Sequence, residues 1–553
     1  MVLRAVATML FTLVFTFSSL SADTQLIPDF TVMIPMRDGT ELPTDLYFPD
    51  GNTNNLPCIL MRCPAGRKAF PWRNYAKLAK YGYIVAIQDT RSALDSEGKT
   101  IPYWADGWGQ EKDGFDTIEW LAKSDFTDGN VGTIGFSAVG ITQQMLAPTA
   151  PPSLKCQYIG VAAGSIYHHA AFPGGQLLKN QVEGWLGYYA KDPSVYNYLC
   201  NQPHYNDFWS SFDTISMAHE VTSPAIHYGG WFDIFIQGSL DSFVARQTKG
   251  KEGARGKQKL IIGPWTHHWP DTISLGDFKV PENAREMPAA FSPKRWFDHY
   301  LKGIENRVDE LPAVTYYVMG PFDGSPSSGN VWRTANHWPV PSVKQSIFLT
   351  EDYSLSSKQT SKRDVEFSYE YDPDNPVPTI GGRNLFIESG PKDQRKIEER
   401  DDVLVFTSQA VEEDVEITGH ILGKLYFSSD SSDTDVVMRF SDVYPDGKSI
   451  LIADSIFRTG LLYHGHHEAI EHDSKVPVEV NLDFWSTSIV IAKGHKLRVT
   501  VSSSNYPRFE RSSNHGGVTK LSIKPITAHN KLHVGSKYPS RIILPVVRGK
   551  LSI

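Results

Sequence analysis

The sequence contains little cysteine. Four of its 553 residues are cysteines: Cys58, Cys63, Cys156 and Cys200. So few thiols in a chain of this length exclude a disulfide-stabilised scaffold, and none of them has the CxxC spacing of a structural zinc site. We therefore expect buried thiols or one incidental disulfide bond.

Blocks of like charge and low-complexity tracts are also absent. The formal net charge is -8, and acidic and basic residues are mixed along the chain. Without a basic block there is no electrostatic footprint for a nucleic acid, so we expect no nucleic-acid partner. With 41% apolar and 21% charged residues, the composition is that of a globular protein and argues against disorder.

Long hydrophobic runs are missing after the N-terminus, so no transmembrane helix is expected. At the N-terminus, Arg4 precedes an uncharged, mostly apolar run, Ala5–Phe17, and small and polar residues follow up to Ala22. This arrangement predicts a secretory signal peptide, residues 1–22, cleaved near Ala22. A membrane anchor is the alternative, but the run is shorter than a bilayer-spanning segment. We expect a secreted or periplasmic protein with no membrane contact after cleavage.

The chain is too long for one hydrophobic core, and its pattern of apolar and polar residues changes along its length, which indicates several domains. Short apolar strands alternate with helices in residues 23–164 and 221–310, which predicts an α/β domain with a parallel sheet. This pattern breaks down in residues 165–220, which we interpret as a largely helical or irregular cap insertion. Short alternating runs separated by turn residues fill residues 311–553 and predict an all-β jelly roll or sandwich.

A serine stands between a predicted strand and a predicted helix. The motif Gly135-Phe136-Ser137-Ala138-Val139-Gly140 follows the strand VGTIGF and opens the helix VGITQQMLA. A sharp strand-to-helix turn would carry Ser137 at its apex, and the small residues around it would let the backbone bend. A tight turn with a structural serine is the alternative, but the flanking strand and helix favour a nucleophile elbow.

A nucleophilic serine needs a base, and that base needs an acid to orient it. In the α/β-hydrolase fold these follow in the order Ser, Asp, His, each at the carboxyl end of a strand. Asp233, in GGWFD, and His267, in GPWTH, stand after predicted strands in that order. A helix N-cap and a surface histidine are the alternative roles. The spacing does not separate His267 from its neighbour His268.

These motifs resemble the family of cocaine esterase, the α-amino acid ester hydrolases, glutaryl acylases and the X-Pro dipeptidyl peptidases. The resemblance runs from about Ile34 to the C-terminus. It implies an α/β-hydrolase domain, a helical cap and a C-terminal jelly roll, and it assigns the triad to Ser137, Asp233 and His267. The supporting segments are Ile34–Pro49, Gln88–Arg91, Ser96–Gly98, Asp128–Gly140, GGWFD, GPWTH, Arg295–Gly303, Glu416–Gly419, Ser428–Val436, Asp442–Gly447 and Ser503–Phe509.

The predicted oxyanion hole departs from this family. The family usually carries Arg-x-Pro-Tyr after its third strand, whereas this chain has Arg62-Cys63-Pro64-Ala65 and so lacks the tyrosine hydroxyl. The backbone N–H of Ala138 is the first expected donor, and one in the Ala65-Gly66 turn is the second. An unreplaced donor would cost about 3 kcal/mol of transition-state stabilisation. The cap looks short for the family, which suggests a wide pocket.

Further binding residues are expected within the same motifs, but no metal site is. Trp231 and Trp265, next to the acid and the base in the sequence, are the predicted substrate-binding residues. His464, His466 and His467 lie together without an evident carboxylate or thiol partner, so we interpret them as solvated. Asp430, Asp433 and Asp435 suggest calcium only as a minor alternative, because the resemblance gives them a structural role. We predict no metal and no cofactor.

The sequence thus predicts a secreted serine hydrolase that cleaves a small or oligomeric ester or amide through an acyl-enzyme. One alternative keeps the site but redirects it to elimination or dehydration of a carbohydrate-derived substrate. Another is an aminopeptidase like the X-Pro dipeptidyl peptidases. A binding protein without activity is a further alternative, which the complete set of Ser137, Asp233 and His267 disfavours.

Overall fold

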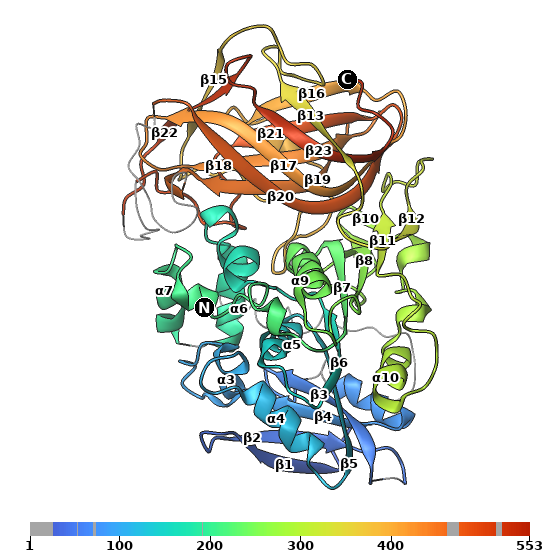
Figure 1. Cartoon of the computed structure of the whole chain (residues 1–553). Coiled ribbons are helices and arrows are strands. Elements are labelled where there is room, and N and C mark those ends of the chain that lie inside the picture. Colours follow the sequence, from blue (N-terminus) through green and yellow to red (C-terminus); the bar gives the residue numbers. More distant parts are fainter. Residues whose placement is uncertain (1–25, 52, 70–72, 191, 462–474, 516–522) are drawn as a thin grey trace.

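The computed structural model describes residues 26–51, 53–69, 73–190, 192–461, 475–515 and 523–553. The predicted signal peptide and the cluster of His464, His466 and His467 therefore lie outside the described residues. An α/β domain and an all-β domain lie at opposite ends of the molecule, with a helical layer beside them (Figure 1). Within the described ranges, no helix is both long and apolar enough to cross a membrane.

The α/β domain is built on a ten-stranded mixed sheet. Strands β4, β3, β5, β6, β7, β8 and β11 run parallel in that spatial order, and β1, β2 and β12 add antiparallel edges. The strands are β1 (Phe30–Pro35), β2 (Glu41–Tyr47), β3 (Leu56–Cys63), β4 (Ile84–Asp89), β5 (Thr127–Phe136), β6 (Leu154–Gly160), β7 (Ala225–Phe232), β8 (Lys259–Thr266), β11 (Val314–Val318) and β12 (Val331–Ala335).

Alternate residues of these strands bury opposite faces of the sheet, as the two-residue period of a strand requires. In β3, Ile59 and Met61 join the core formed with η2 (Asn74–Tyr81) and α10 (Pro293–Lys302). Cys58 and Leu60 point into the core formed with α4 (Asp113–Ala122) and α5 (Ala138–Leu146). The sheet is thus covered on both faces, as the alternating pattern predicts.

The predicted start of the all-β domain does not coincide with the change of sheet. Residue 311 was the expected boundary, yet β11 pairs in parallel with β8, and β12 pairs with β11. The change falls between β12 and β13 (Val343–Leu349). All five residues of β11 are buried, and such a short apolar run does not reveal which sheet it joins.

Helices dominate the segment between β6 and β7, which corresponds to the predicted cap. They include a π-turn, η5 (Tyr167–Ala171), and the helices α6 (Lys179–Tyr189), α7 (Pro193–Cys200) and α8 (Asp207–Ser210). Their apolar faces form one cluster with Ala138 and Ile141 of α5 and with Phe235. The helical layer is therefore packed onto the end of the sheet that carries Ser137.

In its described residues, the C-terminal region is an all-β domain of eleven strands. Their order is β15-β22-β17-β23-β13-β14-β16-β21-β18-β19, and β20 also pairs with β17. Besides β13, they are β14 (Ser354–Ser356), β15 (Val365–Tyr371), β16 (Leu404–Ala410), β17 (Val415–Ser429), β18 (Asp435–Val443), β19 (Ser449–Arg458), β20 (Val478–Ile491), β21 (Lys496–Ser502), β22 (Ala528–Val534) and β23 (Arg541–Arg548).

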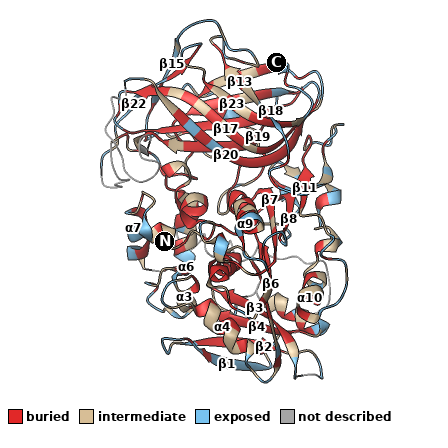
Figure 2. Cartoon of the chain, viewed as in Figure 1, coloured by how far each residue is buried: buried red, intermediate tan, exposed pale blue. Residues whose placement is uncertain are grey.

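The two main domains share one buried core. The same cluster contains Trp231 and Trp265 of the α/β domain and Phe440 and Val499 of the all-β domain. Backbone hydrogen bonds join Met319, just after β11, to Ser488 and Val490 of β20 at 3.0 and 2.8 Å. Figure 2 shows buried residues in both sheets. All four cysteines are buried with free thiols.

Candidate active site

Ser137 occupies a strained turn between β5 and α5. Its φ and ψ are 55° and -126°, a conformation that non-glycine residues rarely adopt. Two glycines make the turn possible. A Cβ on Gly135 would lie 2.2 Å from Cγ1 of Val139, and one on Gly140 would lie 2.7 Å from the carbonyl oxygen of Gly160. The small residues of the motif thus let the turn approach β6 closely.

Ser137, His267 and Asp233 form a hydrogen-bonded chain. Nε2 of His267 lies 2.9 Å from Oγ of Ser137, and its Nδ1 lies 2.6 Å from Oδ2 of Asp233. Asp233 is fully buried, and its Oδ1 accepts the backbone N–H of Phe235 at 2.6 Å. Both oxygens of the carboxylate are therefore hydrogen-bonded, and the carboxylate orients the imidazole toward the serine hydroxyl.

The neighbouring histidine has a different partner. Nε2 of His268 lies 3.0 Å from the carbonyl oxygen of Leu385 and is positioned to donate to it. Burial, together with the nearby His267 ring, lowers the pKa of His268 below its usual value. The geometry therefore separates the two histidines that the sequence spacing left equivalent, because only His267 contacts Ser137.

The two expected oxyanion donors belong to Ala138, which follows Ser137 in the chain, and to Ala65, in the turn after β3, a strand that pairs with β5. Ala138 is the first residue of α5, where a backbone N–H has no acceptor within the helix. Ala65 is half-buried in the turn after β3, and the N–H of Gly66 is already used there, donating to Cys63 at 3.2 Å. Of the two N–H groups in the Ala65-Gly66 turn, that of Ala65 is therefore the better candidate.

An arginine anchors the turn that carries Ala65. The guanidinium of Arg67 forms ion pairs with Asp45 at 2.9 Å and with Asp89. Its backbone N–H also donates to Asp89, at the end of β4. These contacts tie the turn to β2 and β4, which holds its backbone in place.

The prediction that Trp231 and Trp265 bind substrate is wrong. Trp231 is 0% exposed, and its Nε1 donates to the carbonyl of Tyr317 at 2.7 Å. Trp265 is 1% exposed, donates to the carbonyl of Ala284 at 2.7 Å and stacks on Trp269. Both indoles fill the core behind the loops, because strand residues next to a catalytic loop alternate between the site and the interior.

Sequence reasoning missed other neighbours of the site. The ring of Phe235 meets the imidazole of His267 edge-on, with centroids 5.6 Å apart. Leu385, from the long connection between β15 and β16, contacts His268, and Phe386 packs against Gly184 of α6. Phe235 could have been found from the aromatic residues of GGWFDIF. Nothing in the local pattern places residues 385 and 386 beside the triad.

An apolar cavity of about 410 Å³ lies close to the same loops. Phe136 and Trp269, which are close along the chain to Ser137 and His267, are among its lining residues. Tyr158, Tyr228 and Met287 line it as well. It also contains Asp271, whose pKa burial raises to about 6. The cavity is large enough for the apolar part of a small substrate.

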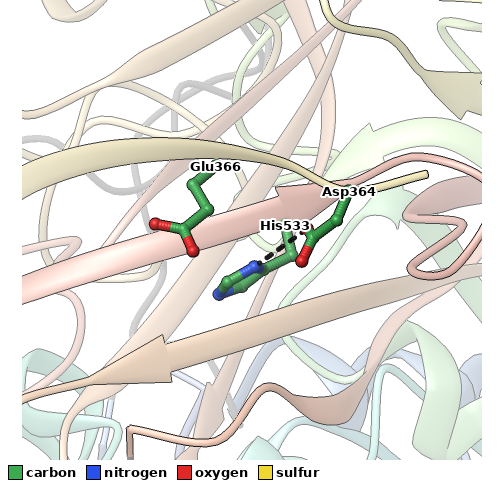
Figure 3. Close-up of side chains that lie close together, drawn as sticks. All are labelled: Asp364, Glu366 and His533. Carbon is green, nitrogen blue, oxygen red and sulfur yellow. Dashed lines mark hydrogen bonds and ion pairs between the residues drawn. The ribbon is translucent and has the colours of Figure 1, made fainter. Parts of the chain in front are cut away.

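Within the part of the all-β domain that the structure describes, one cluster has metal-ligand side chains. Asp364, Glu366 and His533 offer ligand atoms within 4.8 Å of one another (Figure 3). Other partners already engage them: Lys531 pairs with Glu366 at 2.6 Å, and Ser428 lies 2.9 Å from Nε2 of His533. An ammonium beside the cluster would repel a cation, so these residues do not make a convincing metal site.

The aspartates considered for calcium point to separate partners. Asp430 pairs with His529 at 2.7 Å, and Asp433 pairs with Arg458 at 2.7 Å. Asp435 accepts a hydrogen bond from Gln176 at 2.6 Å. These contacts give the three aspartates structural roles.

Two family models match the chain. The one described as X-Pro dipeptidyl-peptidase (S15 family) matches residues 38–192 and 184–269. The other, the X-Pro dipeptidyl-peptidase C-terminal non-catalytic domain, matches residues 306–543. Cocaine esterase from Rhodococcus sp. (strain MB1 Bresler) is 30% identical to this chain, over 94% of this chain and 98% of that protein.

Solved structures with the same fold include two that extend over nearly the whole chain. An aminopeptidase from the marine sediment archaeon Thaumarchaeota archaeon superposes with a TM-score of 0.80 at 22% identity, covering 96% of this chain and 99% of that one. An α-amino acid ester hydrolase superposes with a TM-score of 0.77 at 22% identity and the same coverage. The shared fold is an α/β-hydrolase domain followed by an all-β domain.

Proposed function

The chain belongs to the X-Pro dipeptidyl-peptidase (S15) family of serine hydrolases, together with cocaine esterase, and on that premise we propose that it cleaves an ester through an acyl-enzyme on Ser137. The observation that carries the proposal is the position of His267. One imidazole bridges the hydroxyl of Ser137, at 2.9 Å, and the carboxylate of Asp233, at 2.6 Å. Such an arrangement turns a weak serine nucleophile into a reactive one.

Acylation follows from these contacts. Nε2 of His267 removes the proton of Ser137 as Oγ bonds to the substrate carbonyl carbon. Asp233 keeps the proton on Nδ1 and stabilises the imidazolium that forms. His267 then gives its proton to the leaving alcohol as the bond to the carbonyl carbon breaks, which leaves an acyl group on Ser137.

Deacylation uses the same groups in reverse. His267 removes a proton from water, whose oxygen attacks the acyl carbon. The proton returns to Oγ of Ser137 as the acid is released. The negative oxygen of both tetrahedral intermediates would accept hydrogen bonds from the backbone N–H groups of Ala138 and Ala65, the two donors of the proposed oxyanion hole.

Ester hydrolysis is preferred to peptide hydrolysis for the first test. The relative that is 30% identical is named cocaine esterase, whereas the family models are named for X-Pro dipeptidyl peptidases. The apolar cavity lined by Phe136 and Trp269 suits an aromatic or aliphatic group of an ester. An X-Pro peptide remains the second candidate substrate, supported by the family models.

We further propose that the protein is secreted after removal of residues 1–22. The proposal rests on Arg4, on the apolar run Ala5–Phe17 and on the small residues before Asp23. Expression of the full chain in a secreting host, followed by N-terminal sequencing of the protein in the medium, tests it. A start near Ala22 is expected, and retention in the cell with an intact N-terminus would contradict the proposal.

The decisive experiment is labelling by a fluorophosphonate probe, beside hydrolysis of short-chain aryl esters and of an X-Pro aryl amide. We expect the wild type to be labelled and to turn over the ester, and Ser137→Ala to do neither. Labelling with turnover of the amide alone would favour the peptidase. A folded wild type that is not labelled would overturn the acyl-enzyme proposal and favour elimination on a carbohydrate-derived substrate, for which product formation would then be measured.

A further inference from the structure

A second cavity of about 410 Å³ lies where the helical layer, the α/β domain and the all-β domain meet. Its lining comes from the segment after β6, from α9 (Ile236–Lys249) and from β19 and β20. None of Ser137, Asp233 and His267 is among its lining residues. Unlike the cavity beside Phe136, it is lined about equally by polar and apolar surface.

Buried charge forms part of the cavity wall. Arg508 forms an ion pair with Asp454 at 2.6 Å, and both side chains are at least nine-tenths buried. Nε of Arg508 has no hydrogen-bond partner among the described residues. Arg383 is 3% exposed and donates to the backbone carbonyls of Trp231, Phe484 and Ser486. Nε of Arg508 is covered by neighbouring atoms, so a ligand would meet this residue only through the 7% of its side chain that is exposed, while its guanidinium adds positive charge to the wall.

A strained tryptophan also faces this cavity. In β20, Phe484 and Trp485 together oppose the single residue Ile421 of β17, which makes a β-bulge. Trp485 has a φ of 63°, and its backbone N–H donates to Oδ1 of Asp483 at 2.7 Å. Bulges re-aim side chains, and strained residues of this kind concentrate at ligand sites. The guanidinium of Arg383 lies 5.6 Å from the indole ring.

Carboxylates, amides and imidazoles also line the cavity. Asp241 lies 3.3 Å from Nε2 of His169 and accepts from the amide of Gln237 at 2.7 Å. Asp483 contacts His420, and Asn481 is exposed beside it. The side chains of Asp241 and Asp483 are 39% and 54% exposed, so their remaining lone pairs can reach a ligand.

The lining suits a neutral ligand rich in hydroxyl groups. It holds two arginines, four aspartates and three histidines, so charges of both signs are present and neither a strong anion nor a strong cation is favoured. A hydroxyl both donates and accepts, which matches this mixture. Trp485 is 8% exposed, so it offers a sugar ring the small apolar edge of its indole that borders the cavity rather than a whole ring face.

We propose that this cavity binds a saccharide unit through Trp485, Asp241 and Arg508, at a site separate from Ser137. This inference does not depend on the esterase proposal, because binding can be measured without catalysis. The volume of the cavity, about 410 Å³, accommodates one or two sugar rings.

The test is ligand-observed saturation-transfer NMR on the full chain with cellobiose, maltose and lactose at millimolar concentration. At least one disaccharide is expected to bind. Asp241→Asn and Trp485→Ala should each weaken that binding about tenfold or more. Asp446→Asn, a matched change at an exposed residue in the turn between β18 and β19, should leave the binding unchanged. Asp241→Asn also covers the case in which the strained Trp485 cannot be replaced without loss of folding.

Four outcomes would overturn the proposal. The first is that none of the three disaccharides binds. The second is that a disaccharide binds the folded Asp241→Asn variant as tightly as the wild type. The third is that glucosamine or citrate binds while the neutral sugars do not, which would indicate a site for a charged ligand. The fourth is that the disaccharide protects Ser137 from the fluorophosphonate probe by direct competition, which would place the sugar in the candidate active site.

Discussion

Nδ1 of His267 lies 2.6 Å from Oδ2 of Asp233, and the carboxylate has no solvent exposure. Its other oxygen accepts the N–H of Phe235, so Asp233 cannot turn away from the imidazole without losing a buried hydrogen bond. The proposed function depends on this contact, because it sets the tautomer that leaves Nε2 free to accept the proton of Ser137.

Asp233→Asn should therefore keep the fold and lose most of the activity. The amide can still accept from Phe235, but it can present an N–H to Nδ1 and so favour the wrong imidazole tautomer. We expect kcat for an aryl ester to fall by about 10⁴, with a melting temperature close to that of the wild type. His268→Ala is the matched control and should retain activity. Near-normal turnover by Asp233→Asn would remove Asp233 from the mechanism.

The close approach of the turn at Ser137 makes a second prediction. A Cβ added in Gly140→Ala would lie 2.7 Å from the carbonyl oxygen of Gly160 and 2.9 Å from Cβ of Ala162. We expect a loss of about 1–3 kcal/mol in the free energy of unfolding and a lower kcat, because the turn must move. Gly187→Ala in α6, which meets nothing within 4 Å, is the control and should be neutral or stabilising. Denaturant unfolding of both variants measures the difference.

The missing tyrosine at Ala65 can be replaced by mutation. If a hydroxyl from this position can reach the oxyanion, Ala65→Tyr should raise kcat for an aryl ester by about 10²-fold, the usual effect of one donor. Ala65→Phe adds the same ring without the hydroxyl and is the control. Equal rates for the two variants would indicate that backbone N–H groups already complete the hole.

Asp435 predicts a pH-dependent stability. Burial raises its pKa to about 7, against an ordinary value of 3.8, and Oδ1 has no partner among the described residues. Between these two values the folded state binds more protons than the unfolded state, so this group makes stability fall as pH rises from about 4 to 7.

Asp435→Asn removes this titration and can still hold Gln176, which now donates to Asp435 at 2.6 Å. We expect the melting temperature of the wild type to decrease more between about pH 4 and pH 7, the span of this titration, than that of Asp435→Asn. Asp446→Asn, at an exposed site, should follow the wild type. Parallel curves for wild type and Asp435→Asn would contradict the raised pKa.

The four buried thiols should be unreactive in the native protein. Burial raises the pKa of all four, that of Cys200 to about 11, so little thiolate forms near neutral pH. A disulfide reagent such as DTNB should titrate no thiol in the folded protein and four in denaturant, without prior reduction. Fewer than four after unfolding would show that a disulfide bond exists.

Much of the α/β domain could be predicted because its signals are local. The run at β4 is short, apolar and rich in β-branched residues, β5 ends in VGTIGF, and Ser137 stands at a strand-to-helix junction that small residues permit. The order of Ser137, Asp233 and His267 at successive strand ends needed only the fold rule. Local pattern also predicted that residues 165–220 leave the sheet.

The predictions that the structure corrects depended on contacts between residues that are distant in the chain. The sequence of β11 marks a strand, but only its pairing with β8 shows that it completes the first sheet. Trp231 and Trp265 stand beside the acid and the base in the sequence, yet their rings turn into the core because side chains alternate along a strand.

The sequence by itself determined the elements, the nucleophile turn and the candidate triad, since backbone bending, periodicity and chain order are properties of neighbouring residues. The tertiary structure decided which histidine meets Ser137, which aromatic rings surround it, and that three separate segments enclose the cavity at Trp485. These features depend on packing between residues that lie far apart in the chain, such as Ser137 and His267, which are 130 positions apart, and no local pattern encodes such contacts.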